Sequence, residues 1–321
     1  MLIDTLGVRV LGTAEVLPAR VVTTAEVAAL CGVDAHLAVE RTGVHTRRWL
    51  SPDEDPLDLG VTAALAALED AGLTVDDVDV VLGASATPLQ GMPDGGALVA
   101  AGLRLRDGVA YSLQGSCISF LFALREAGFL IDSGRAQHVL VVSTEAGSRL
   151  LDPAQPESAL LIGDAAAAVV LGPAIEAGQG IVTSAFRTRA SGASDAEIRG
   201  LGTRGAGSPP RDGRLDLRGR RLIGGALTDL PPFLESLRPG LTQGADGIDR
   251  ILPLPASRAC LEMFARFWGR DRTVDTLGEL GNTMAASLPV ALHRAEIKPE
   301  ETLLLVGSGA GCHHGAMILR A

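Results

Sequence analysis

The segment "GSCISFLFALREAGFLIDSG" (residues 115–134) carries the strongest fold signal in the sequence. Apolar residues cover nearly every face of the helix expected over 118–134, which predicts a central helix enclosed by other elements. The Gly-Ser lead-in places Cys117 at or near the helix N-terminus, where the helix dipole and free N–H groups favour thiolate over thiol. A thiol with a lowered pKa is a competent nucleophile, and the alternative interpretation is a small buried core cysteine.

Around this helix, short apolar runs bounded by Gly, Asp or Pro predict buried strands, and helical periodicity alternates with them. The strands are expected at 78–86, 138–144, 159–172 and 302–309, and a helix over 58–72 ends at Gly72. This alternation predicts an α/β protein with buried parallel or mixed strands.

A faint internal repeat also follows the chain. "VDVVLGASATP", "GSC" and "HVLVVSTEAG" recur in the same order as "IDRILPLPAS", "GNT" and "TLLLVGSGAG". Matched order predicts two fused copies of one unit, although strand–loop–helix units also resemble each other by chance. Two copies would bring the N-termini of two central helices together, at Cys117 and Asn282, facing a shared cleft.

Composition narrows the function classes. The chain has 321 residues, 47% of them hydrophobic, which is enough for one large core or two fused ones. A net charge of −10, 3% aromatic residues and no basic run argue against a nucleic-acid partner. Four scattered cysteines and six histidines without ligand spacing predict no metal site. With neither a signal peptide nor a run of about 18 apolar residues, we expect a cytoplasmic protein that does not span a membrane.

Two further motifs offer polar groups to the predicted cleft. In "ELGNTMAASLPVAL" (279–292), Asn282 is either a helix N-cap or an amide donor to a developing oxyanion. In "LLVGSGAG" (304–311), glycines allow backbone N–H groups to approach a substrate closely. The alternative interpretation of the same residues is a simple tight turn.

Residues 185–222 are rich in Gly and Ser and hold nine arginines, which predicts a long loop or lid. A solvated surface insertion is one interpretation of this segment. A positive rim for a phosphorylated carrier, such as coenzyme A or the phosphopantetheine of an acidic carrier protein, is the other.

Together these motifs resemble the β-ketoacyl-acyl-carrier-protein synthase III family of the thiolase superfamily, over nearly the whole chain. The matching segments are "ERTGVHTRRW" (40–49), "GSCISFLFAL" (115–124), "LLIGDAAAAVVLG" (160–172), "GNTMAAS" (281–287) and "GSGAGCHHGA" (307–316). The resemblance implies a duplicated, five-layered αβαβα thiolase-like fold and a homodimer. Its halves would be residues 1–172, with the nucleophile, and 173–321, with the lid or loop at 185–222.

The resemblance also implies roles at the reaction centre. Cys117 would accept an acyl group from a coenzyme A or carrier-protein thioester. The backbone N–H groups of Cys117 and Ala310 would form the oxyanion hole, and Asn282 would stand where the family has a catalytic Asn. No permanently bound cofactor is implied, because acyl-coenzyme A or acyl-phosphopantetheine is the substrate.

Further positions match the family's substrate path. Arg41 and Arg149 match arginines near the carrier entrance. Met92, in "TPLQGMP", aligns with the residue that reaches across the dimer and caps the partner's acyl pocket. An unbranched, flexible Met there suits an adaptable acyl channel.

Other positions depart from the family pattern. The family's Pro-His-Gln-Ala-Asn is "PLPAS" (253–257) here, so Leu254 replaces the catalytic His and Ser257 replaces the terminal Asn. The family's stacking Trp at the coenzyme A entrance aligns with Leu37. Two glycines of its Gly-Asp run become Ala165 and Ala167.

The side chain of Leu254 cannot donate a hydrogen bond, and losing one such donor typically costs ~10²–10³ in rate. We therefore expect an acyltransferase or unusual condensing enzyme of specialised biosynthesis, with weak or no malonyl decarboxylation and a small-molecule acceptor. One alternative is an ordinary synthase III, making 3-oxoacyl-carrier by decarboxylative Claisen condensation, in which His313 or His314 supplies the imidazole. Another is a non-catalytic subunit that pairs with an active homologue.

Overall fold

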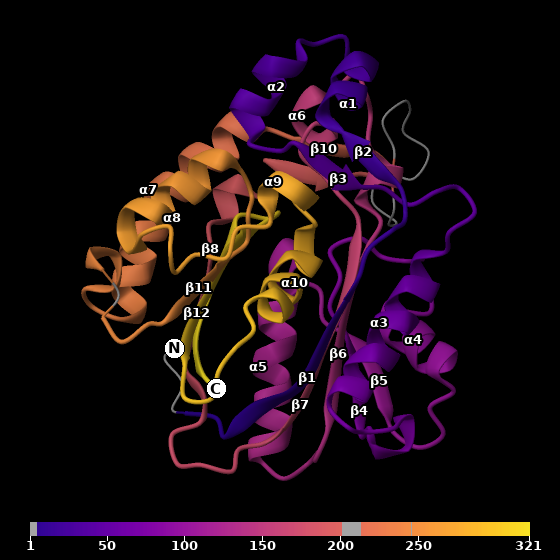
Figure 1. Ribbon diagram of the computed structural model, residues 1–321, viewed down its shortest axis with the longest axis vertical. Coiled ribbons are helices and arrows are strands. Elements are labelled where there is room, and N and C mark those ends of the chain that lie inside the picture. The colour runs from indigo at the N-terminus through magenta and orange to yellow at the C-terminus, as the bar shows by residue number, and fades with distance from the viewer. Residues whose placement is uncertain (1–4, 201–212, 245) are drawn as a thin grey trace.

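A computed structural model describes residues 5–200, 213–244 and 246–321. Two mixed sheets lie on either side of its central helices (Figure 1). The strands of the first sheet are, in spatial order, β1 (Val8–Val16), β7 (Ala165–Pro173), β6 (Val139–Glu145), β4 (Val80–Gly83) and β5 (Val109–Ser112). Those of the second are β11 (Arg250–Pro253), β12 (Thr302–Gly309), β13 (His313–Arg320) and β8 (Gly180–Thr188).

The two sheets repeat one topology. The series β1-β7-β6-β4 runs antiparallel, antiparallel, parallel, and the series β8-β13-β12-β11 has the same three relations in the same order. Strand β5 extends the first sheet parallel to β4 and has no counterpart among the described strands of the second sheet. This correspondence confirms the predicted duplication.

Helices separate and cover the sheets in five layers (Figure 1). The central layer holds α5 (Ser119–Asp132) and α10 (Ser287–Arg294), which contact strands of both sheets. The outer layers are α3 (Pro56–Asp70) with α4 (Gly95–Leu103), and α7 (Gly219–Leu237) with α8 (Arg258–Trp268). The α/β, αβαβα thiolase-like arrangement is therefore confirmed.

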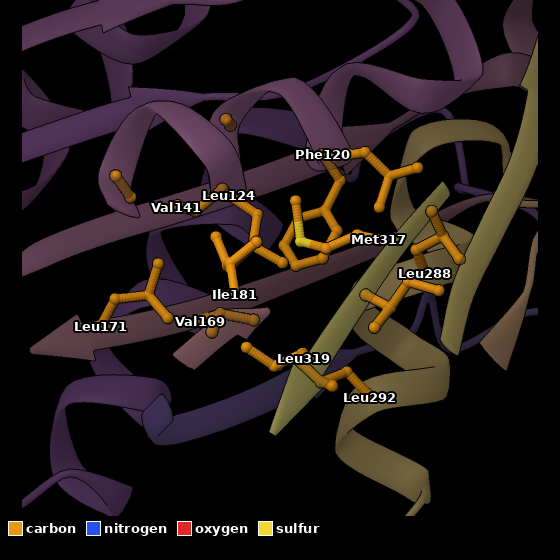
Figure 2. Close-up of a cluster of buried hydrophobic side chains, with 14 of the residues drawn as sticks. Phe120, Leu124, Val141, Val169, Leu171, Ile181, Leu288, Leu292, Met317 and Leu319 are labelled. Atoms are coloured by element: carbon orange, nitrogen blue, oxygen red, sulfur yellow. The ribbon is translucent and has the colours of Figure 1, made fainter. Parts of the chain in front are cut away.

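The central helices are buried because their apolar residues point to both sheets. Figure 2 shows Phe120 and Leu124 of α5 beside Val141 and Leu171 of the first sheet. Met317 and Leu319 of the second sheet and Leu288 and Leu292 of α10 complete the same cluster. Each such side chain contributes about 1.5–3 kcal/mol when fully buried, so the cluster anchors both helices between the sheets.

A group of short elements lies across one end of the sheets (Figure 1). Its members are β2 (Val21–Thr23), α1 (Thr24–Cys31), α2 (Ala35–Thr42), β3 (Thr46–Arg48), α6 (Pro156–Ala159), β9 (Ala196–Ile198), β10 (Leu215–Leu217) and α9 (Leu277–Leu280). Local signals set their ends. The Thr23 side chain caps α1 in a capping box with Glu26, and Gly32 and Gly43 end α1 and α2 in the left-handed region.

The structure corrects two element predictions. The strand expected from residue 159 begins only at Ala165, because the chain before it ends α6 at Ala159, turns, and pairs Ile162 with Asn282 in an isolated bridge. The segment 185–222 is not one loop. Its start lies in β8, its end lies in α7, and β9 pairs with β10 between them. Residues 201–212 lie outside the described residues, and the division of the chain at residue 172 stays a prediction.

Candidate active site

A cavity of about 1060 Å³ opens between the two halves of the fold. Residues from both central-helix turns, from the strand ends of the second sheet and from α2, α7 and α8 line it. The structure brings six of the residues predicted for the site together in its wall, namely Arg41, Cys117, Leu254, Ser257, Asn282 and Ala310.

Cys117 lies on the 3₁₀ turn η2 (Ser116–Ile118), directly before α5. Ser116 holds the left-handed conformation with φ 54°, an uncommon one for a non-glycine residue. The Ser119 hydroxyl fixes this turn, since it accepts from Gly115 N at 2.9 Å and donates to the Ser116 carbonyl at 2.6 Å. The prediction that Cys117 lies at a helix N-terminus is confirmed.

The second half repeats this turn. Met284 opens η6 (Met284–Ala286) with φ 51°, and η6 contacts η2 and leads into α10. Because Ser116 and Met284 are equivalent in backbone geometry, Ala285 is the counterpart of Cys117. The repeat inferred from the sequence aligned the glycines of "GSC" and "GNT". The structure aligns the strained residues Ser116 and Met284 instead, so the predicted register is wrong by two residues.

Backbone donors converge on the thiol. The N–H groups of Ala310 and of Cys117 itself hydrogen-bond to the sulfur and act to lower its pKa. The chain approaches closely here, because a Cβ added at Gly309 would lie 3.1 Å from the Cys117 nitrogen. A pair of N–H groups beside a nucleophile is the arrangement that stabilises a developing oxyanion.

These donors do not suffice to keep Cys117 in the thiolate form at neutral pH. Burial, and secondarily the negative charge of Glu145, raise the pKa of the thiol to about 12. The sequence-based expectation of a lowered pKa is therefore wrong. Cys117 precedes the first residue of α5, and desolvation of the charged form outweighs the backbone donors.

Glu145, at the end of β6, is a buried carboxyl that the sequence analysis missed. It accepts from the backbone and hydroxyl of Thr87 at 3.0 and 2.6 Å, from Ala86 N at 2.5 Å and from Ala285 N at 3.3 Å. Burial nevertheless raises the pKa of Glu145 to about 7. The signal in the sequence was an acidic residue directly after the buried strand predicted at 138–144.

Asn282 is buried and held on both sides. Its backbone pairs with the Ile162 segment, donating to Leu161 O at 2.8 Å and accepting from Gly163 N at 3.1 Å. Its Oδ1 accepts from Met284 N at 2.8 Å. The N-cap interpretation of Asn282 is wrong, because Thr283 is the N-cap of η6 and Ala286 is that of α10. Oδ1 instead stabilises the turn into η6, and the Nδ2 group is left for a ligand in the cavity.

Leu254 follows β11 and is 2% exposed. Its backbone nitrogen donates to Val306 O at 2.8 Å, and a Cβ added at Gly307 would meet the Leu254 Cβ at 2.8 Å. Hydrocarbon thus fills the cavity wall at this position. Ser257, which the sequence predicted to stand at the family's terminal Asn, is the N-cap of α8, with its hydroxyl accepting from Cys260 N at 3.4 Å.

Of the remaining predicted residues, one lines the same cavity and two lie outside it. Leu37, 47% exposed, lines the cavity near Arg41 on α2. Arg149 lines a separate cavity of about 420 Å³ and donates to the Glu54 carbonyl. Met92 is 87% exposed and lines neither cavity of this chain.

Ala165 and Ala167, which the sequence predicted to stand at two family glycines, are fully buried on β7. Their methyl groups pack in one cluster with Leu280 and Val290, on the side of the sheet that faces α10. They therefore act in packing behind the cavity.

Both candidate histidines line the cavity, but their partners differ. His313 Nδ1 lies 2.8 Å from the Thr188 hydroxyl, and His314 Nδ1 lies 2.7 Å from the Ser308 hydroxyl. His314 is 1% exposed and its Nε2 lies 3.6 Å from Asp229 Oδ2. Both histidines therefore lie at the cavity wall. They differ in that the His314 ring has a carboxylate, Asp229, beside it.

Among the residues that the structure describes, no helix combines the length and the apolar character needed to cross a bilayer.

Comparison with known proteins assigns the family. The model of 3-oxoacyl-[acyl-carrier-protein] synthase III matches residues 111–190, and that of its C-terminal part matches residues 242–321. The chain is 34% identical to β-ketoacyl-[acyl-carrier-protein] synthase III of Rhizorhabdus wittichii, over 97% of this chain and 98% of the relative.

Solved structures agree with this assignment. The 3-oxoacyl-[acyl-carrier-protein] synthase III of Aquifex aeolicus superposes with a TM-score of 0.88 at 25% identity, covering 98% of this chain and 100% of that one. The priming β-ketosynthase of the R1128 polyketide biosynthetic pathway gives 0.89 at 27% identity, covering 99% and 97%. With this fold, this cavity and these relatives, the chain belongs to the β-ketoacyl-[acyl-carrier-protein] synthase III family, a group of acyl-transferring enzymes of the thiolase fold.

Proposed function

We propose that this protein transfers acyl groups from a coenzyme A or carrier-protein thioester through a thioester on Cys117. The observation that carries this proposal is the thiol on its strained turn, in the cavity wall, with the N–H groups of Ala310 and Cys117 directed at it. In the first step the Cys117 sulfur attacks the thioester carbonyl and loses its proton. The C–S bond of the donor then breaks, and the departing thiolate takes up the proton that Cys117 has lost, so the donor leaves as a free thiol.

The acceptor has two candidates. The relatives' names support a carbon nucleophile, hence a 3-oxoacyl product from decarboxylative Claisen condensation. Leu254 supports the other candidate, a small-molecule acceptor attacked with weak or no malonyl decarboxylation, because the cavity has hydrocarbon where a hydrogen-bond donor would stabilise the enolate. In both, the Asn282 Nδ2 group donates to the developing oxyanion.

Partners follow from the same proposal. Arg41 at the cavity wall suits the phosphates of coenzyme A or phosphopantetheine. Arg149 would assist carrier docking, although it lines the smaller cavity. The exposed Met92 suits a homodimer in which it reaches the partner's acyl pocket. We place the enzyme in the cytoplasm, without a resident cofactor.

Incubation with an acyl-coenzyme A and malonyl-carrier protein separates the two acceptor candidates. The condensation candidate predicts equal amounts of carbon dioxide and 3-oxoacyl-carrier, and the other predicts acyl-enzyme with little of either. A protein that forms no acyl-enzyme and releases no carbon dioxide would instead be the non-catalytic subunit.

A further inference from the structure

A second polar centre lies on the opposite face of the strand that closes the Cys117 site. Gly307 and Gly309 of β12 face the nucleophile, since added Cβ atoms would lie 2.8 Å from the Leu254 Cβ and 3.1 Å from the Cys117 nitrogen. Side chains alternate along a strand, so Ser308 between them faces the other side, toward α7. The cavity reaches this side too, because Ser308 lines it.

Ser308, His314 and Asp229 form a hydroxyl–imidazole–carboxylate series. Ser308 pairs with His314 across the β12–β13 ladder, and the Ser308 Oγ to His314 Nδ1 distance is 2.7 Å. His314 Nε2, on the other edge of the ring, lies 3.6 Å from Oδ2 of Asp229 on α7. This order of groups is the one in which a base activates a serine and a carboxylate orients the base.

Arg189 fixes the carboxylate end of this series. Its Nε lies 2.8 Å from Asp229 Oδ2, and its Nη2 donates to Cys312 Sγ at 3.1 Å. Asp229, Cys312 and His314 offer ligand atoms within 4.8 Å of one another, the usual reach of a metal site. The guanidinium, however, already supplies positive charge to two of them, so a metal ion would have to displace it.

The charges around the ring favour a neutral imidazole. Burial lowers the pKa of His314; Asp229 opposes this shift, and Arg187 and Arg189 reinforce it. A neutral ring with its proton on Nε2 directs that N–H at Asp229 and offers Nδ1 to the Ser308 proton. This is the protonation state that general-base catalysis needs near neutral pH.

The walls beside Ser308 are apolar. Ala226 and Leu230 of α7 and Cys260 and Phe264 of α8 line the same cavity. A hydrocarbon chain that packs against these side chains would bring its carbonyl end to a polar group, and Ser308 is the half-buried hydroxyl on that side of β12. The chemistry of this region therefore fits an acyl thioester.

From this geometry we propose that Ser308 is a second acyl-accepting nucleophile, with His314 as its base and Asp229 as the positioning residue. The Ser308 Oγ attacks the thioester carbonyl while His314 Nδ1 takes the hydroxyl proton. The C–S bond breaks and the thiolate leaves with that proton, giving an acyl ester on Ser308. Water attacks this ester in the same manner, so the net reaction is thioester hydrolysis. The proposal goes beyond the Cys117 chemistry and does not depend on it.

The test uses the full-length Cys117→Ala protein, which removes the other nucleophile. Diisopropyl fluorophosphate reacts with activated serines, and peptide mass spectrometry locates its adduct. We expect one adduct on Ser308, and slow release of free acid from octanoyl-coenzyme A in the same protein. Ser308→Ala should abolish both, and His314→Asn should slow labelling by ~10² or more, the lower range for a lost general base.

His313→Asn is the matched control, because the neighbouring histidine bonds Thr188 and should leave labelling of Ser308 unchanged. Asp229→Asn should slow labelling and move its rise with pH to lower pH, because Asp229 raises the pKa of His314; loss of packing alone would not produce that shift. Unlabelled Ser308 in a protein with the wild-type melting temperature would overturn the proposal. Equal labelling rates with and without the His314 imidazole would also overturn it.

Discussion

Asn282 binds the backbone nitrogen of Met284 through Oδ1 at 2.8 Å, so one side chain both shapes the η6 turn and presents an N–H donor to the cavity. Asn282→Asp separates the two functions, because aspartate keeps the acceptor and loses the donor. We expect acylation of Cys117 to persist and transfer to the acceptor to fall by ~10²–10³, the usual effect of one lost oxyanion donor. Single-turnover measurement of the two steps checks this.

The control for that experiment is Asn282→Ala, which loses both functions and should also destabilise the fold by about 1 kcal/mol, as loss of one intramolecular hydrogen bond does. Wild-type transfer by a folded Asn282→Asp protein would show that the amide N–H takes no part in the reaction.

The proposed weak decarboxylation rests on Leu254. Leu254→His places a donor beside Gly307, and carbon dioxide release from malonyl-carrier should rise by ~10²–10³. Leu254→Met, which conserves volume and adds no donor, should leave the rate unchanged. If the wild-type protein already decarboxylates malonyl-carrier as fast as folded Leu254→His, the imidazole is supplied from elsewhere or is not needed.

The thiol of Cys117 should react slowly with iodoacetamide at neutral pH, because burial and Glu145 raise its pKa to about 12. Glu145→Gln removes the negative charge and should speed alkylation. The pKa of Glu145 is itself raised to about 7, so the carboxyl is largely neutral below that pH, and the variants should diverge only above it. Rates measured from pH 5 to 10 check this, with Glu69→Gln on the exposed face of α3 as control. Parallel profiles for wild type and Glu145→Gln would rule out the charge coupling.

Gly163 allows the chain before β7 to pair with Asn282. A Cβ there would collide with the Leu280 carbonyl oxygen and lie 3.2 Å from the Arg47 Cβ. Gly163→Ala should therefore lower the free energy of unfolding by about 1–3 kcal/mol, as overpacking does. Gly224→Ala, in α7 with open space around it, should be neutral or stabilise by up to about 1 kcal/mol. Urea denaturation distinguishes them, and equal stability of Gly163→Ala and wild type would contradict the close approach.

Much of the fold could be predicted because its signals are local. The apolar run after Cys117 predicted α5, and the recurring order of strand, turn and strand predicted the duplication. The same local order brought Cys117 and Asn282 to one cavity. The predicted register of the repeat was wrong by two residues, because Ser116 and Met284 share a backbone conformation that their residue types do not indicate.

The electrostatics of the site could not be predicted in this way, because they depend on contacts between distant segments. Glu145 accepts a hydrogen bond from Thr87, which lies 58 residues earlier in the sequence. Asp229 lies beside His314 only because α7 packs on the second sheet. Helix position suggested a lowered pKa for Cys117, whereas the depth of burial decides the direction of the shift.

Intact-mass measurement after incubation with acyl-coenzyme A or acyl-carrier protein shows whether Cys117 carries the acyl group. We expect a mass increase of one acyl group, located on the Cys117 peptide and removed by hydroxylamine. Cys117→Ala should lack this adduct, and Cys260→Ala should retain it. An unmodified Cys117 with every thioester offered, in a folded protein, would show that acyl transfer does not pass through this thiol.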